Sequence, residues 1–267
     1  MLRDPFLKSL RDQARGLIVW VIGIAAYVAL LMSVYPSVRD SAGQLQGYVD
    51  NLPEAFRTAF LGAGGDFASP RGFINTELFS WLGPIVFIAF AVGAANRALA
   101  GEEEDGTLTL LLAYPLSRPS LVLQRFAAMV VTIGVLGLAF WLSLVVATVL
   151  AGMDVGAGAL GQALLLFTLL GLAVGSVTLA VGAATGRKAA GIAAGAGVGV
   201  AMYLLNTLGQ INKTLEPYRV LSLFHYTGGT TPLGRGLGAA DVAVLAGTTL
   251  VLLAVTLVLF ERRDIRV

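Results

Sequence analysis

The sequence contains no cysteine and only one histidine, His225. A chain without cysteine has neither a disulfide framework nor a thiolate metal site, and one histidine cannot supply the histidine pairs typical of zinc sites. A Walker A loop is also missing. Residues 182–188 (GAATGRK) resemble that motif, but they have the wrong spacing and no Ser or Thr after the lysine. We therefore expect no metal site, no catalytic residues and no cofactor in this chain.

Charge is scarce as well. Only 13% of the 267 residues are charged and 57% are hydrophobic, with a mean hydropathy of +0.81. A soluble domain carries about 25% charged residues, so this composition indicates an integral membrane protein. The net charge of +2 is modest, and no basic stripe with interleaved aromatic residues is present, which argues against a nucleic-acid partner. The first apolar run starts too late and is too long for a cleavable signal peptide.

Long apolar segments make up most of the chain. Each of six segments approaches or exceeds the roughly 20 residues that cross a bilayer as a helix. They predict an all-α integral membrane fold with a single transmembrane domain, residues 1–267. None has an ionisable side chain in its interior, which argues against an ion-driven carrier. The predicted spans are residues 16–35, 78–96, 126–150, 159–185, 189–208 and 241–260.

Residues 2–15 precede the first span and have the pattern of an amphipathic helix. One side is apolar and the opposite side is charged, as in a helix that lies in the headgroup plane. A soluble tail is the alternative. The apolar side holds Leu2, Phe6, Leu10 and Ala14, and the charged side holds Asp4, Lys8, Arg11 and Arg15.

The distribution of basic residues predicts the orientation. With the N-terminus inside, twelve of the eighteen Lys and Arg residues fall on the inner side. We therefore expect both termini and the loop 97–125 to be cytoplasmic, with the large loops 36–77 and 209–240 outside.

Charge, turn residues and helix signals come together only in the loop 97–125. Four consecutive acids occupy positions 102–105, and leucines at helical spacing then form one face of a short amphipathic helix. Pro115 ends that helix, because proline lacks an N–H and disfavours a helical residue before it. Ser117 is the expected N-cap of the next helix. Residue spacing alone fits a solvated loop with a capped helix as well as it fits a functional loop.

The order of these residues resembles the cytoplasmic loop signature of type 2 ATP-binding cassette (ABC) transporter permeases. The sequence departs from that signature at Asp105, where a basic residue is common, at Thr109, where an acid is common, and at Arg125, which replaces a lysine. The end of the chain, Phe260-Glu-Arg-Arg-Asp-Ile, is also similar to the tail of this family. The matching loop positions are Glu102, Gly106, Thr107, Leu108, Leu111, Leu112, Pro115, Ser117 and Arg118.

The resemblance implies a permease subunit that is not itself an enzyme. A separate soluble ATPase subunit would bind ATP and Mg, and a second copy or a sister permease would complete the assembly in the lipid of a bacterial plasma membrane. The short loop helix, about residues 106–114, would be a coupling helix that docks on the ATPase. The implied docking residues are Glu102, Glu103 and Arg118 as polar contacts, Leu108, Leu111 and Leu112 as apolar anchors, and Gly106, Thr107 and Pro115 in the turns.

The substrate path is harder to predict. Polar or aromatic groups within spans usually face protein or a cavity, so Tyr27, Trp141, Tyr203 and Asn206 are candidates; ordinary packing between helices is the alternative. Without a charged cavity, we expect export of an amphipathic or apolar substrate such as a drug, a peptide antibiotic or a lipid. Glycines spaced four apart at 191, 195 and 199 favour close packing within the chain over a dimer seam.

Two other functions stay open. The chain would fit a membrane anchor or mechanotransmission subunit for an ATPase that transports nothing. Such proteins usually carry a large folded outer domain, and the loop 36–77 is small for one. A secondary carrier is the third possibility, which the uncharged spans disfavour.

Overall fold

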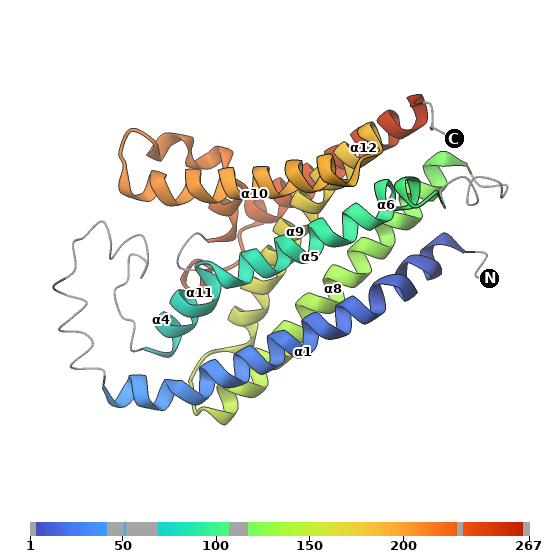
Figure 1. Ribbon diagram of the computed structural model, residues 1–267. Helices are drawn as coiled ribbons and strands as arrows, with labels where there is room; N and C mark the ends of the chain where they lie inside the picture. The colour runs from blue at the N-terminus through green and yellow to red at the C-terminus, as the bar shows by residue number, and fades with distance from the viewer. Residues whose placement is uncertain (1–3, 42–50, 52–68, 107–116, 229–231, 264–267) are drawn as a thin grey trace.

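The computed structural model describes residues 4–41, 51, 69–106, 117–228 and 232–263, and these form a bundle of helices without strands (Figure 1). Six helices in this part of the chain are long and apolar enough to cross a membrane. The predicted all-α integral membrane fold is therefore confirmed. The helices that account for the six spans are α1 (Pro5–Asp40), α5 (Leu82–Ala98), α8 (Arg118–Leu150), α9 (Ala157–Thr185), α10 (Lys188–Ile211) and α12 (Ala239–Arg262).

Short elements join the long helices. The second span begins before α5 with α4 (Pro70–Ile74) and one π-helical turn, η1 (Asn75–Phe79), and α6 (Ala100–Glu104) follows it. Between α10 and α12, the chain forms two 3₁₀ helices, η2 (Glu216–Leu221) and η3 (Leu223–Thr227), and then α11 (Pro232–Arg235). The helices η2 and η3 lie against the long helices of the bundle, with Phe224 buried.

The central helix is α9, which packs against α5, α8, α10 and α12, while α1 packs along α8. The first turns of α1 and the last turns of α12 lie at the same end of the bundle (Figure 1). We call this end, which includes Asp4 and Arg263, the terminal end, and the opposite end the distal end.

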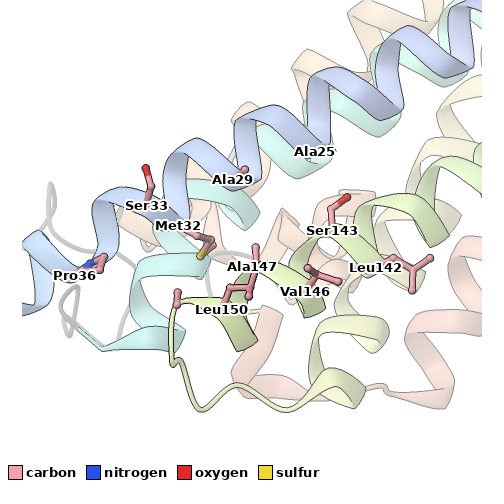
Figure 2. Close-up of a pocket in the computed structure, with 11 residues that line it drawn as sticks. Ala25, Ala29, Met32, Ser33, Pro36, Leu142, Ser143, Val146, Ala147 and Leu150 are labelled. Atoms are coloured by element: carbon pink, nitrogen blue, oxygen red, sulfur yellow. The ribbon is translucent and has the colours of Figure 1, made fainter.

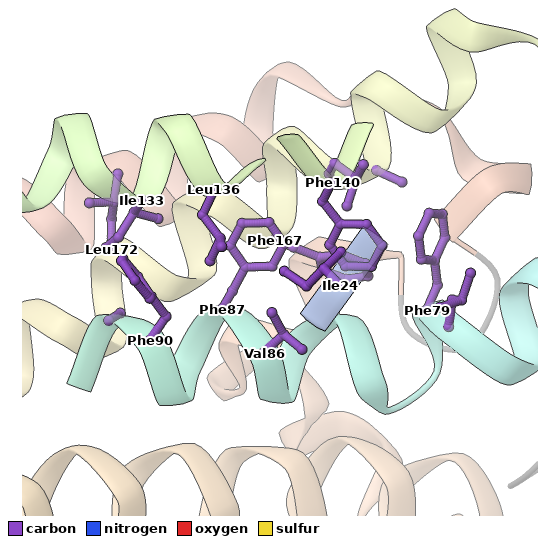
Figure 3. Packing of buried hydrophobic residues seen from close by; sticks show 14 of the residues in the cluster. Ile24, Phe79, Val86, Phe87, Phe90, Ile133, Leu136, Phe140, Phe167 and Leu172 are labelled. Carbon is purple, nitrogen blue, oxygen red and sulfur yellow. The ribbon is translucent and has the colours of Figure 1, made fainter. Parts of the chain in front are cut away.

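Aromatic rings fill the centre of the bundle between α5, α8 and α9 (Figure 3). Phe87 stacks on Phe140 with ring centroids 6.2 Å apart, and Phe167 contacts Phe79 edge-on at 5.4 Å. All four rings are almost fully buried. Such rings bury large apolar areas and, packed in defined geometries, hold the three helices in one arrangement.

The glycines of α10 pack within the chain, as predicted. Gly191, Gly195 and Gly199 are buried, and a Cβ atom on Gly195 would lie only 1.9 Å from the Thr178 hydroxyl oxygen of α9. Small residues at these positions let α10 approach α9 and α5 closely.

Several helices extend beyond the predicted spans. Helix α1 continues without a break from Pro5 to Asp40, so the predicted amphipathic segment is helical but not separate from the first span. Its 36 residues make about 54 Å of helix, well beyond a hydrocarbon core of about 30 Å. Helix α8 starts at Arg118, because Ser117 caps it as predicted by accepting the Ser120 N–H. The longer spans consequently include charged residues that lay outside the predicted ones, Glu77 and Arg125 among them.

Candidate functional site

The predicted coupling helix lies outside the described residues. This applies to Thr107, Leu108, Leu111, Leu112 and Pro115, so their docking role stays a prediction. The structure does describe both flanks: α6 with the acids 102–105 on one side, and the capped start of α8 on the other.

Glu102 is buried at the centre of a charged cluster. Lys8 of α1 donates to both of its carboxylate oxygens, at 2.8 and 2.9 Å, and Arg125 of α8 donates to one of them at 2.8 Å. Arg125 is only 2% exposed and also donates to the Ser9 hydroxyl. A buried carboxylate is stable only when it is paired and hydrogen-bonded, and Glu102 meets both conditions. It therefore fastens α6 to α1 and α8.

Glu103 reaches the opposite side of the same end. Its carboxylate pairs with Arg263, which directly follows α12 and also donates to the Ala183 carbonyl oxygen of α9 at 2.9 Å. Gly186 ends α9 in the left-handed conformation (φ 66°), and a Cβ atom there would collide with both members of the pair. Only glycine fits this point, where α6, α9 and the end of α12 meet.

The last two acids of the run bind the first residue of α10. The Lys188 N–H donates to Glu104 at 2.8 Å, and its ammonium group donates to Asp105 at 2.6 Å. These contacts are exposed and individually weak. The four acids together form one structure, which we call the acidic clamp: residues 102–105 with their partners Lys8, Arg125, Lys188 and Arg263.

Arg118 joins the two long helices next to the clamp. Its guanidinium group donates to the carbonyl oxygens of Phe260, Glu261 and Arg263, at 3.4, 3.2 and 2.7 Å. The last carbonyls of a helix have no partner within the helix, so a cation there both satisfies and stabilises them. Arg118 thus ties the start of α8 to the end of α12.

The sequence singled out Glu102, Glu103 and Arg118, but it missed the residues with which they pair. Lys8 was assigned to the charged side of an amphipathic segment and Lys188 to a basic turn. Arg125 stood out only as a departure from the family signature. Sequence spacing does not reveal pairs that are 94 or 160 residues apart.

A groove lies between the distal halves of α1 and α8 (Figure 2). Its volume is about 620 Å³ and its lining is almost entirely apolar. The two hydroxyl groups in it are satisfied by their own helices, since Ser33 donates to the Leu30 carbonyl oxygen and Ser143 to that of Ala139. The groove therefore presents hydrocarbon rather than hydrogen-bonding groups.

The four candidate substrate-path residues lie in different surroundings. Trp141 donates to the Ala157 carbonyl oxygen at 2.9 Å, and Tyr203 packs its ring on Phe224 at 5.5 Å. Asn206 is buried, and its amide oxygen has no partner among the described residues. Tyr27 is half-buried on α1. The structure does not bring these residues together, and their role in a path stays a prediction.

The fold defines the class of protein, a multi-pass membrane protein with six apolar helices. Residues 6–265 match the family model for the ABC-2 family transporter protein, so the chain belongs to that family. It is a permease, the membrane component of an ABC transporter rather than its ATPase. A comparison with curated proteins found no significant match.

Proposed function

We propose that this permease works as an exporter with a separate soluble ATPase, which docks on the segment between α6 and α8. The terminal end of the bundle would then face the cytoplasm of a bacterium, as the distribution of basic residues predicts. The partner would bind ATP and Mg²⁺. A second permease, identical or related, would form the other half of the transporter.

The acidic clamp is the observation that carries this proposal. The clamp immediately precedes the expected docking segment and is bonded to α1, α8, α10 and the end of α12. A displacement of the docking segment would therefore act on the terminal ends of several spans at once. Arg118 extends this linkage from the other flank of the segment.

The strengths of these contacts suggest which helices move with the segment. Glu102 is itself buried and holds α8 through the buried Arg125 and α1 through the partly exposed Lys8, whereas Lys188 holds α10 through carboxylates that are exposed. Buried pairs are costly to break, and exposed pairs contribute about 0–1 kcal/mol. We therefore propose that α1, α6 and α8 move as one unit during the ATPase cycle, and that α10 can separate from them.

The test is to co-express the chain with the ATPase encoded beside it and to purify the complex in detergent. Leu111→Asp places a charge on the predicted apolar docking face. We expect it to abolish co-purification and vanadate-sensitive ATP hydrolysis by the complex.

Thr109→Asp is the matched control, because it adds the same charge two residues away, where the resembling family commonly has an acid. It should leave both measurements near wild type. If Leu111→Asp retains the ATPase and its activity, the segment is not the docking site. Association without transport of any cargo would instead favour the anchor function.

A further inference from the structure

Glu77 is an acidic residue inside a candidate membrane span. It lies in the π-helical turn η1, twenty residues before Arg97. Twenty residues of helix are about 30 Å long. Since a hydrocarbon core is about 30 Å thick and Arg97 lies at the terminal end, Glu77 lies close to the distal edge of that core.

The carboxylate of Glu77 has no partner among the residues that the structure describes. Within the described residues, no hydrogen bond or ion pair reaches it, although it is about half-buried. The neighbouring Thr76 hydroxyl is also buried and unpartnered. Ionisable groups at membrane depth are expensive and are normally paired, so an unpaired one is a candidate for binding a ligand.

The turn that carries Glu77 is held in place from two sides. The Ser80 N–H and hydroxyl group both donate to the Asn75 carbonyl oxygen at 2.7 Å, closing the π-helical turn. The Asn75 side chain accepts the Leu233 N–H of α11 at 3.3 Å. Single π-helical turns are frequent at functional sites. The position of Glu77 is therefore fixed by contacts that leave its own carboxylate unused.

An aromatic and apolar surface adjoins this carboxylate. The Tyr27 phenol of α1 lies within electrostatic range of Glu77, and Trp81 and Ile85, which follow on the same span, are 42% and 53% exposed. An acid with aromatic side chains nearby is a combination that can bind an ammonium group, through ion pairing and cation–π attraction. The exposed apolar residues deeper in the span offer contact to a hydrocarbon tail.

We propose that Glu77 recognises the cationic group of an amphiphile whose apolar part lies along α1 and α5. The ligand class is a single cation, an ammonium or a comparable group, attached to a hydrocarbon body. As a statement about cargo, this inference rests on the proposed transport function, and it narrows the cargo to cationic amphiphiles. The binding itself does not require the ATPase.

The test is equilibrium binding to the full chain in an uncharged maltoside detergent. The probes are a fluorescent quaternary ammonium amphiphile with one alkyl chain and its uncharged carbon isostere. Wild type should bind the cation roughly tenfold or more tightly than the isostere. Glu77→Gln should remove this preference by weakening the cation alone, and Glu77→Asp should retain part of it.

Asp154→Asn is the matched control, because Asp154 is an exposed acid at the same end of the bundle. It should keep the full preference, and thermal unfolding should show that all variants are folded. Equal binding of both probes by wild type, binding of neither, or a preference that survives in Glu77→Gln would each overturn the proposal. Failure of the wild-type chain to associate with the ATPase in the earlier experiment would overturn only the transport function.

Ammonium groups also occur in membrane lipids, and the same assay separates the two sources. Phosphatidylethanolamine added to the micelles would displace the probe if the site binds a lipid headgroup. Phosphatidylglycerol, which lacks an amine, would not. If neither lipid displaces the probe, the site is assigned to a soluble amphiphile.

Discussion

At the terminal end of the bundle, charged side chains are paired across helices, whereas at the distal end several polar groups have no partner. The acidic clamp ties residues 102–105 to four cations on other elements. Among the described residues, the carboxylate of Glu77 is unpaired at the distal end, and buried atoms of Asn206, Arg219 and His225 lack partners there. Buried atoms of Asn96, Arg125 and Thr178 in the terminal half also lack partners, so the two ends differ chiefly in their ion pairs. Arg235–Asp241 is the one described ion pair at the distal end that joins different elements.

This difference indicates a division of labour. Paired buried charges fix geometry, because separating them leaves an uncompensated charge. Unpaired polar groups keep their capacity to bind something else or to rearrange. Under the proposed function, an ATPase acting at one end would need a firm connection there, and cargo would need an adaptable end at which to bind or be released.

Removing the centre of the clamp should have the largest effect on stability. Glu102→Gln leaves Arg125 buried without a carboxylate, and breaking such a buried pair costs about 3–5 kcal/mol. Unfolding by SDS in mixed micelles, followed by tryptophan fluorescence, measures this free energy. Combining Glu102→Gln with Arg125→Met removes the stranded charge and should recover most of the loss.

Glu104→Gln is the matched control for that experiment, since its side chain is 41% exposed and its pair with Lys188 is long, at 3.9 Å. It should cost less than about 1 kcal/mol. Equal losses from Glu102→Gln and Glu104→Gln would show that burial does not distinguish the two acids.

Arg118→Gln tests the other flank of the proposed docking segment. The substitution removes a cation that donates to three carbonyl oxygens at the end of α12. Hydrogen bonds to charged groups contribute about 1.5–3 kcal/mol, and partial exposure here places the expected loss near 1–2 kcal/mol in the same SDS titration. Arg118→Lys keeps the charge and should recover part of this loss. If Arg118→Gln is as stable as wild type, the contacts of Arg118 do not tie α12 to α8.

The sequence was sufficient to predict the membrane-spanning helices, but it did not predict the polar contacts between them. Hydropathy over about 20 residues detects a span directly, and Ser117 was recognisable as a cap because capping is local. The pairs of Glu102 with Lys8 and of Glu103 with Arg263 join distant parts of the chain, and local patterns carry no information about them.

Helix ends were harder to predict than helix existence. Helix α1 runs without a break from Pro5 to Asp40 because nothing in its sequence stops it; even Pro36 lies within the helix. Because the second candidate span starts at Pro70 rather than at residue 78, Glu77 changed from a loop residue to an acid within that span. The most informative candidate at the distal end was therefore hidden by a boundary error of eight residues, about two turns of helix.

Arg235→Gln probes the cross-element ion pair of the distal end. The Arg235 guanidinium group lies 3.1 Å from the carboxylate of the buried Asp241, but the Arg235 side chain is 44% exposed. Water can therefore replace much of the hydrogen bonding that the guanidinium group gives to the carboxylate. We expect a loss of about 0.5–1 kcal/mol, clearly below that of Glu102→Gln. Asp241→Asn should cost more than Arg235→Gln, because it changes the buried member of the pair. If Arg235→Gln lowers the free energy of unfolding as much as Glu102→Gln does, the ion pairs of the two ends do not differ in strength.

His225 should give the smallest effect, and a pH-dependent one. Burial lowers the pKa of His225, and the charges of Arg235 and Arg219 lower it further, while Asp241 acts in the opposite direction. The unfolded state, with a pKa of about 6.5, then takes up the proton more readily than the folded state. Stability is therefore full above about pH 6.5 and falls as the pH drops from there through the folded pKa.

His225→Gln isolates this contribution, because the chain has no other histidine. Between pH 7 and 5.5, the thermal midpoint of wild type should fall slightly more than that of His225→Gln. Arg235→Gln should reduce the difference, since it removes one of the two cations that oppose protonation. If acidification instead stabilised wild type relative to His225→Gln, the pKa would be raised rather than lowered. Asp241 would then outweigh burial and both arginines, and the distal end would be better compensated than its unpartnered atoms indicate.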